Sequence, residues 1–124
     1  MSKIIVFGTG KYGKEAYDFF GDDNVLCFAD NNAALTGKYL YEKEIILPSD
    51  IQSHYKEYLI ILAAREELCI EMEYQLMKMG IENSLNFIFI RDYILSGRID
   101  FNEFIDRYLD DAYIYKLKYK QELR

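Results

Sequence analysis

A glycine-rich hexapeptide near the start of the chain constrains the fold more than any other feature. Gly8-Thr9-Gly10-Lys11-Tyr12-Gly13 follows the apolar run Ile4–Phe7 and leads into a helical pattern over residues 11–20. A continuous β-branched apolar run is typical of a strand buried on both faces of a parallel sheet. A strand, a GxGxxG turn and a helix, in that order, are the first half of a dinucleotide-binding βαβ unit.

Further strands and helices alternate up to about residue 90. Apolar runs predict strands, and helical spacing with turn residues predicts the helices between them. The predicted strands are 25–29, 58–62 and 85–90, with a short strand or hairpin within 39–47; the predicted helices are 48–55, opened by a Ser49–Gln52 capping box, and 65–79. This alternation implies an α/β fold: a Rossmann-like parallel sheet of four to five strands with helices on both faces, over residues 1–90.

Residues 91–124 form a helical extension in this prediction. A short helix is expected at 92–96, and a long amphipathic helix is expected to start at Asp100, whose side chain caps it, with Glu103 three residues later. Its apolar stripe comprises Phe101, Phe104, Ile105, Tyr108, Ala112, Tyr115 and Tyr119. The helix either covers the sheet or meets another subunit. Its length of ~30 Å exceeds what a small sheet needs, so we expect a homodimer or a partner protein bound through it.

Each glycine of the loop has a physical role in a phosphate site. Gly8 permits the tight turn out of the strand, Gly10 lets phosphate approach the backbone, and Gly13 lets the helix pack against the strand. Asp30 follows about twenty residues later, where a carboxylate accepts hydrogen bonds from ribose hydroxyls and repels a 2′-phosphate. This favours NAD or a UDP-type nucleotide-sugar. The alternative is that the glycines serve only packing and that Asp30 is a turn residue.

Residues after other strands complete the candidate site. Ala63 and Arg65 follow the strand expected beside the first one, where ligands bind at the switch point of such sheets. Arg65 either reaches an anionic ligand or only begins a helix. The candidate ligand-binding residues are Gly8, Thr9, Gly10, Lys11, Tyr12, Gly13, Asp30, Asn31, Ala63 and Arg65.

The sequence offers weak candidates for catalysis. His54 is the only histidine and has no acidic or thiol partner nearby in sequence, and no spacing of residues predicts a metal site. Tyr74 and Lys78 have the Tyr-x-x-x-Lys spacing of short-chain reductases, a pair that chance also produces in a chain with 12 tyrosines. A binding module that is not catalytic alone is therefore the main hypothesis. A small NAD-dependent oxidoreductase and an S-adenosylmethionine-binding domain are the alternatives.

Composition limits the surroundings in which the protein acts. The formal net charge is −6 and no basic patch is evident, which predicts no nucleic-acid partner. No apolar run reaches the ~18 residues of a membrane-spanning helix, so we expect no membrane association. Cys27 and Cys69 lie in apolar patterns, typical of buried free thiols in a reducing, cytoplasmic compartment.

The chain also resembles a known family over residues 3 to 90. The motifs are the glycine loop, a strand ending in Asp30-Asn31, Gly37, and the stretch Ile46 to Asp50. They are similar to the small Rossmann-like domain at the front of bacterial polysaccharide-biosynthesis proteins: nucleotide-sugar epimerase/dehydratases, sugar acyltransferases and FkbM-type methyltransferases. The resemblance implies binding of a nucleotide or nucleotide-sugar in surface-polysaccharide metabolism, with the chemistry located in an attached domain.

Overall fold

A six-stranded sheet forms the centre of the computed structural model, which describes residues 4–55 and 57–124 without the side chains of His54 and Tyr55. Its strand order is β3-β4-β2-β1-β5-β6, and only the β3–β4 pair is antiparallel. The strands are β1 (Ile4–Phe7), β2 (Val25–Ala29), β3 (Tyr39–Leu40), β4 (Lys43–Ile46), β5 (Leu59–Leu62) and β6 (Ser84–Asn86). The prediction of an α/β, Rossmann-like fold is confirmed, and the hairpin adds one strand to the four or five expected.

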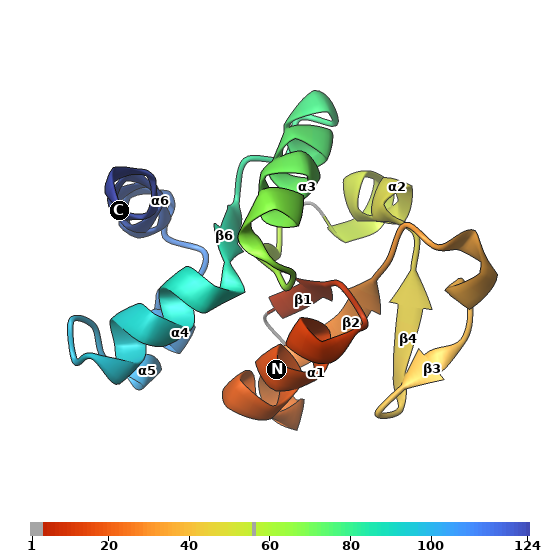
Figure 1. The fold of residues 1–124 in the computed structure, drawn as a ribbon, viewed down its shortest axis with the longest axis horizontal. Coiled ribbons are helices and arrows are strands. Elements are labelled where there is room, and N and C mark those ends of the chain that lie inside the picture. Colours follow the sequence, from red (N-terminus) through yellow and green to blue (C-terminus); the bar gives the residue numbers. More distant parts are fainter. Residues whose placement is uncertain (1–3, 56) are drawn as a thin grey trace.

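Helices cover both faces of this sheet, as Figure 1 shows. The helices are α1 (Lys11–Phe20), α2 (Pro48–Asp50), α3 (Glu66–Lys78), α4 (Phe87–Leu95), α5 (Phe101–Asp106) and α6 (Asp111–Leu123), and a π-helical turn (Ile51–Tyr55) continues α2. Alternate residues of β1 face opposite sides, so Ile4 and Val6 pack with α1, α4, α5 and α6. Ile5 and Phe7 pack with α3 and Ile51 on the other side.

One predicted strand end and one predicted helix cap are wrong. The run Phe87–Ile90 was expected to extend a strand, yet it begins α4 after only three strand residues. Phe87, Phe89 and Ile90 are all buried there, and a short continuous apolar run fits a buried helix as well as a buried strand. The Ser49–Gln52 capping box is also absent: Leu47 precedes α2, and Gln52 donates to the backbone oxygen of Met79 instead (3.0 Å).

The single long C-terminal helix is two helices. Asp100 caps α5 as predicted, accepting from the Glu103 amide (3.1 Å). The chain then breaks, because Asp110 caps α6 through the Tyr113 amide (3.2 Å) and forms an ion pair with Arg107 (2.9 Å). The break shifts the helical register. Tyr113, Ile114, Leu117 and Gln121 are buried in α6, whereas Tyr115 and Tyr119, expected in the apolar stripe, are exposed.

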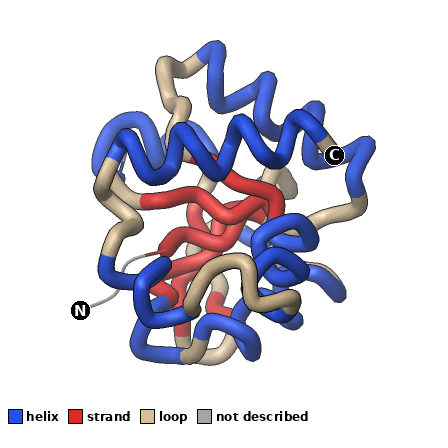
Figure 2. Tube along the Cα trace, turned by 90° about the vertical axis from the view of Figure 1, so that its left-hand side faces the viewer, coloured by secondary structure: helices blue, strands red, loops and turns tan. Residues whose placement is uncertain are grey.

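Helix α6 covers the edge of the sheet at β6, as Figure 2 shows. The buried Gln121 Oε1 accepts the Asn86 amide proton of β6 at 2.7 Å. Lys118 Nζ donates to the Glu82 carbonyl oxygen (2.7 Å) just before the strand. The outer side of an edge strand leaves backbone groups without a partner strand. In the described sheet, Gln121 and Lys118 provide hydrogen bonds for two such groups, the Asn86 amide and the Glu82 carbonyl oxygen.

Replacing Gln121 with Met is expected to lower the free energy of unfolding by about 1–3 kcal/mol. The variant keeps the shape of the side chain but leaves the buried Asn86 N–H without its acceptor. Urea unfolding of both proteins measures the difference. The matched control is Lys120→Met on the exposed neighbouring residue, for which we expect a change within about 0.5 kcal/mol. Equal losses in both variants would contradict the role of this hydrogen bond.

Both cysteines are buried and free, as predicted. Burial raises the pKa of the Cys27 thiol to about 12, with the Glu44 carboxylate adding to the effect. Burial also raises the pKa of Cys69, whose Sγ donates to the Ala64 carbonyl oxygen at 3.2 Å. The folded state therefore holds both thiols in the neutral, unreactive form.

We therefore expect the native Cys27 thiol to react at least about 100-fold more slowly with a disulfide reagent at pH 8 than in the unfolded chain, because the thiolate is the reactive form. The native Cys69 thiol is also expected to react more slowly than in the unfolded chain. Absorbance of the released thiol follows the reaction. Rapid labelling of the native protein would contradict the burial.

The pKa of the Cys27 thiol is higher in the folded protein than in the unfolded chain. The contribution of this thiol to the free energy of unfolding is therefore complete below about pH 8.5 and is lost as the pH rises further.

Candidate functional site

A pocket of about 450 Å³ opens at the carboxyl ends of β1, β2 and β5. Sheet hydrogen bonds hold its backbone: the Gly8 amide donates to the Ala29 oxygen (2.8 Å), and the Ala63 amide donates to the Phe7 oxygen (2.9 Å). Strand β1 lies between β2 and β5, so the pocket lies at the switch point of the sheet. Its lining residues are Phe7, Gly8, Thr9, Gly10, Lys11, Tyr12, Asp30, Asn31, Ala63, Ala64, Arg65, Leu68 and Met72.

The three glycines of the loop differ in what surrounds them. A Cβ on Gly8 would lie 2.4 Å from the Ala63 carbonyl oxygen, and the φ of Gly8 is +124°. A Cβ on Gly13 would lie 2.1 Å from the Gly8 carbonyl oxygen. Around Gly10, however, a Cβ would meet nothing within 4 Å. Gly8 and Gly13 are therefore required by packing, whereas Gly10 faces open space.

The amino end of α1 borders the pocket at Gly10, Lys11 and Tyr12. Gly10 precedes the helix and has no side chain to cap it, and the first helical hydrogen bond runs from the Lys14 amide to the Gly10 oxygen (3.0 Å). No acidic residue occupies the first turn, which instead carries Lys11 and Lys14. Lysines are unfavourable near the positive end of the helix dipole, whereas an anion is favourable there.

Asp30 lines the pocket and is held in place from two sides. Thr9 Oγ1 donates to Asp30 Oδ2 at 2.6 Å, and the Asn32 amide donates to Oδ1 at 2.8 Å. The Thr9 bond joins the glycine loop to the turn after β2, which sequence spacing alone did not predict. Each carboxylate oxygen keeps capacity for a second hydrogen bond, which a ligand hydroxyl could donate.

Helix α3 supplies the apolar wall of the pocket. Ala63 and Arg65 line the pocket from the segment between β5 and α3, and the Arg65 side chain is largely exposed, with an ion pair to Glu67 (3.8 Å). Leu68 and Met72 also line the pocket, although the candidate ligand-binding residues predicted from the sequence do not include them. Leu68 is 42% exposed, and an exposed large apolar residue in a pocket is the signal that marks it.

A pair of amides spans the outer side of the site. Asn31 Nδ2 donates to Gln75 Oε1 (3.0 Å), and Gln75 Nε2 donates to Asn31 Oδ1 (2.8 Å). The pair links the turn after β2 to α3 beside the pocket, which Asn31 lines.

The residues considered for catalysis lie away from this pocket or outside the described part. Tyr74 does not line the pocket and is 60% exposed, and Lys78 Nζ lies 4.5 Å from the centre of its ring. The side chain of His54 is outside the described residues. Among the described residues, no group of three or more His, Cys, Asp or Glu is placed to hold a metal ion. No helix in the described ranges is long and apolar enough to cross a bilayer.

Comparisons with known proteins support the same type of fold. A family model described as C2185-like, N-terminal, matches residues 1–87. The fold is similar to that of RSP, a Rex-family repressor, with a TM-score of 0.53 and 19% identity over 70% of this chain. It is also similar to UDP-D-quinovosamine 4-dehydrogenase from Vibrio fischeri, with a TM-score of 0.51 and 12% identity over 81% of this chain.

A second RSP structure, in complex with beta-NAD+ and operator DNA, has a TM-score of 0.52 and 14% identity over 86% of this chain. This chain spans 45% and 60% of the two RSP chains and 88% of the dehydrogenase chain. At these identities the similarity establishes the fold. No curated protein matches the sequence.

The prediction that excluded a nucleic-acid partner is wrong. It rested on the net charge of −6 and on the lack of an evident basic patch, yet a solved structure with a similar fold is a repressor in complex with operator DNA. Contacts to DNA phosphates are made by local clusters of Lys and Arg, whatever the net charge of the chain. In a larger protein such clusters can also lie outside the domain whose fold is similar. The total charge of this chain therefore does not exclude that class of partner.

Proposed function

The chain belongs to the C2185-like family through its N-terminal region, and from that premise we propose that it binds a nucleotide at the glycine loop. The diphosphate lies over Gly10 against the first amides of α1, and the ribose hydroxyls donate to Asp30. The apolar wall of Leu68 and Met72 packs against the base. Thr9, Asn31, Ala63 and Arg65 surround these contacts, with Lys11 and Tyr12 at the helix start.

The observation that carries this proposal is the open space at Gly10. Packing explains why residues 8 and 13 are glycine, but nothing in the described structure requires glycine at residue 10. A missing Cβ at that point exposes backbone at the amino end of a helix that has no acidic residue in its first turn. This is what close approach of a phosphate needs.

NAD is the ligand we favour. A carboxylate at Asp30 accepts hydrogen bonds from a free ribose and repels a 2′-phosphate, so NADP is disfavoured. The RSP structure solved with beta-NAD+ gives a protein of similar fold in complex with this dinucleotide.

A nucleotide-sugar of UDP type is the second candidate. The similarity to UDP-D-quinovosamine 4-dehydrogenase extends over 88% of that chain, which supports this class of ligand. It agrees with the resemblance to polysaccharide-biosynthesis domains. In either case we propose a binding module in sugar or surface-polysaccharide metabolism, in the cytoplasm, whose chemistry is supplied by another domain or protein.

Calorimetric titration with NAD+, NADP+, UDP-glucose and S-adenosylhomocysteine tests the proposal. We expect NAD+ to bind at least about ten-fold more tightly than NADP+, and Asp30→Asn to reduce that preference, because the variant no longer repels a 2′-phosphate. At a concentration of 100 Kd the ligand is expected to raise the free energy of unfolding by ~2.7 kcal/mol.

The control is Asp50→Asn, which removes the same charge from an acid outside the pocket. Tighter binding of UDP-glucose than of NAD+ would favour the second candidate. Selective binding of S-adenosylhomocysteine would favour a methyltransferase-like domain. Absence of binding by all four compounds contradicts the proposal.

A further inference from the structure

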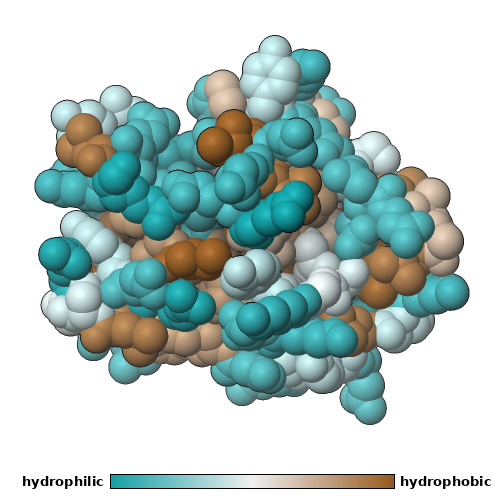
Figure 3. All heavy atoms as spheres, in the orientation of Figure 1, coloured by the Kyte–Doolittle hydropathy of each residue, from teal (hydrophilic) through white to brown (hydrophobic). Residues whose placement is uncertain are grey.

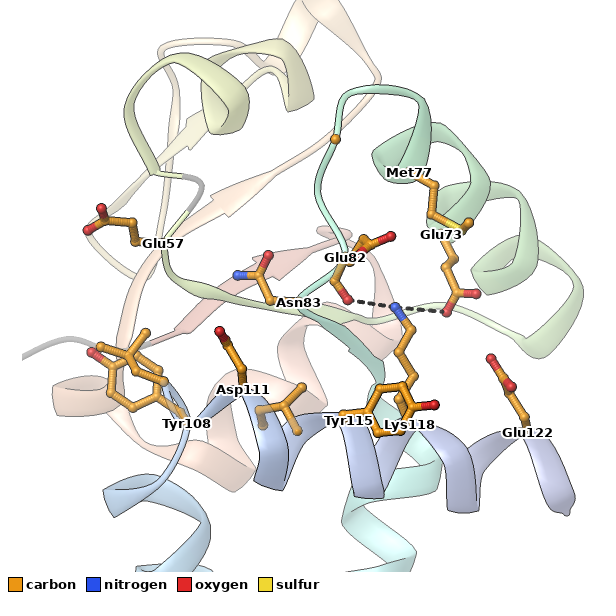
Figure 4. Close-up of a pocket in the computed structure, with 13 residues that line it drawn as sticks. Glu57, Glu73, Met77, Glu82, Asn83, Tyr108, Asp111, Tyr115, Lys118 and Glu122 are labelled. Atoms are coloured by element: carbon orange, nitrogen blue, oxygen red, sulfur yellow. Dashed lines mark hydrogen bonds and ion pairs between the residues drawn. The ribbon is translucent and has the colours of Figure 1, made fainter.

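A second hollow lies between α3 and α6, away from the glycine loop. It is an open groove of about 890 Å³, drawn in Figure 4. Its walls are the carboxyl-terminal half of α3, the segments that lead into β5 and β6, and α6 with the turn before it. It shares no lining residue with the glycine-loop pocket, so the proposed nucleotide site does not account for it.

The charge of this groove is strongly negative. Five carboxylates line it and one amine does, against 21 acids and 15 bases in the whole chain. The amine is Lys118, whose Nζ donates to the Glu82 carbonyl oxygen (2.7 Å) and lies 3.8 Å from a Glu73 carboxylate oxygen. The Lys118 ammonium group is therefore already paired with groups of the groove wall, and Figure 4 draws both contacts as dashed lines. The carboxylates are Glu57, Glu73, Glu82, Asp111 and Glu122.

Apolar side chains lie exposed among these acids. Met77, Leu109 and Tyr115 line the groove and are 49%, 55% and 73% exposed. Two more exposed apolar residues, Ile70 and Tyr74, lie outside the groove on α3. Their spacing places them on the same side of the helix as Met77. Figure 3 shows apolar side chains at the surface over α3 and over α6, with hydrophilic ones between them. Exposed apolar side chains in a groove of this kind are what the apolar face of an amphipathic helix can pack against.

We propose that this groove binds a basic amphipathic segment of a partner protein. Lysines or arginines of the segment face the carboxylates, and its apolar side chains cover Met77, Leu109 and Tyr115, as a helix does in an apolar groove. A second copy of this chain fits less well. A two-fold contact places the same patch on both sides, so it would bring the five carboxylates of one copy against those of the other.

The test uses a fluorescein-labelled amphipathic peptide of Leu-Lys-Lys-Leu repeats, with fluorescence anisotropy as the readout. The groove variant is E57Q/E82Q/E122Q, and the matched control is D18N/D23N/E42Q, which removes three exposed carboxylates elsewhere. We expect the groove variant to bind the peptide at least about ten-fold more weakly than the control variant does. Salt screens the attraction between distant charges, so the carboxylates next to the bound peptide contribute most to its affinity. Equal losses in both variants overturn the proposal, since they indicate attraction to net charge alone.

Methionine-methyl NMR locates the peptide. Met77 lines the groove, whereas Met72 lines the glycine-loop pocket, so each reports on one site. The peptide is expected to shift the Met77 signal and leave Met72 unchanged, and M77S is expected to weaken binding. A shift confined to Met72 overturns the proposal without affecting the nucleotide site. Light scattering that shows a dimer of the wild type, lost in M77S, overturns it in favour of a second copy.

Discussion

Gly13→Ala is expected to lower the free energy of unfolding by roughly 3 kcal/mol or more, enough to prevent folding of a marginally stable domain. The new Cβ would lie 2.1 Å from the Gly8 carbonyl oxygen, and that contact is with backbone, which no side-chain rotation relieves. Helix α1 and the exit of β1 would have to move apart. Urea unfolding monitored by circular dichroism measures the loss.

The control for this prediction lies in the same loop. Gly10→Ala adds the same methyl group where nothing lies within 4 Å. Its backbone is extended, with φ of −84°, so we expect a loss below about 1 kcal/mol, the usual difference between Gly and Ala before a helix. If the two variants were equally stable, the packing roles assigned to the loop glycines would be wrong.

Gly10→Val is expected to weaken nucleotide binding by about 100-fold or more while the protein still folds. The branched side chain occupies the open space over the first amides of α1, so a phosphate can no longer approach the backbone. Loss of one or two charge-assisted hydrogen bonds at ~1.5–3 kcal/mol each accounts for this size of effect. Calorimetric titration with NAD+ measures it.

A size series separates this effect from damage to the fold. Gly10→Ala is expected to bind NAD+ with intermediate affinity. In both variants we expect Cys27 to react with the disulfide reagent as slowly as in the wild type, and unfolding to stay cooperative. Unchanged affinity in Gly10→Val would mean that the ligand does not contact this part of the loop.

The central strands and the glycine loop could be predicted from the sequence because their signals are local. The apolar run Ile4–Phe7 is buried on both faces, and the GxGxxG spacing fixes a strand-to-helix turn. The wall of the site was only partly predictable. Leu68 and Met72 follow the helical spacing of core residues, and only the placement of α3 beside β5 shows that they also line a pocket.

The carboxyl-terminal half was harder to predict because tertiary contacts decide it. Phe87–Ile90 fits a strand or a buried helix equally well by pattern. The break between α5 and α6 depends on Asp110, which is one acid among several in that stretch until its bonds to Tyr113 and Arg107 are seen. Gln121 looks like a surface residue, yet it is buried because it binds the edge strand.

Methyl NMR of methionine-labelled protein tests most directly whether a nucleotide occupies the glycine-loop pocket. Titration with NAD+, and separately with UDP-glucose, is expected to shift the Met72 methyl signal saturably while Met77 stays still, and Gly10→Val is expected to abolish that shift. A Met72 signal that neither nucleotide moves in the wild type, or one that moves equally in Gly10→Val, would contradict binding at the loop.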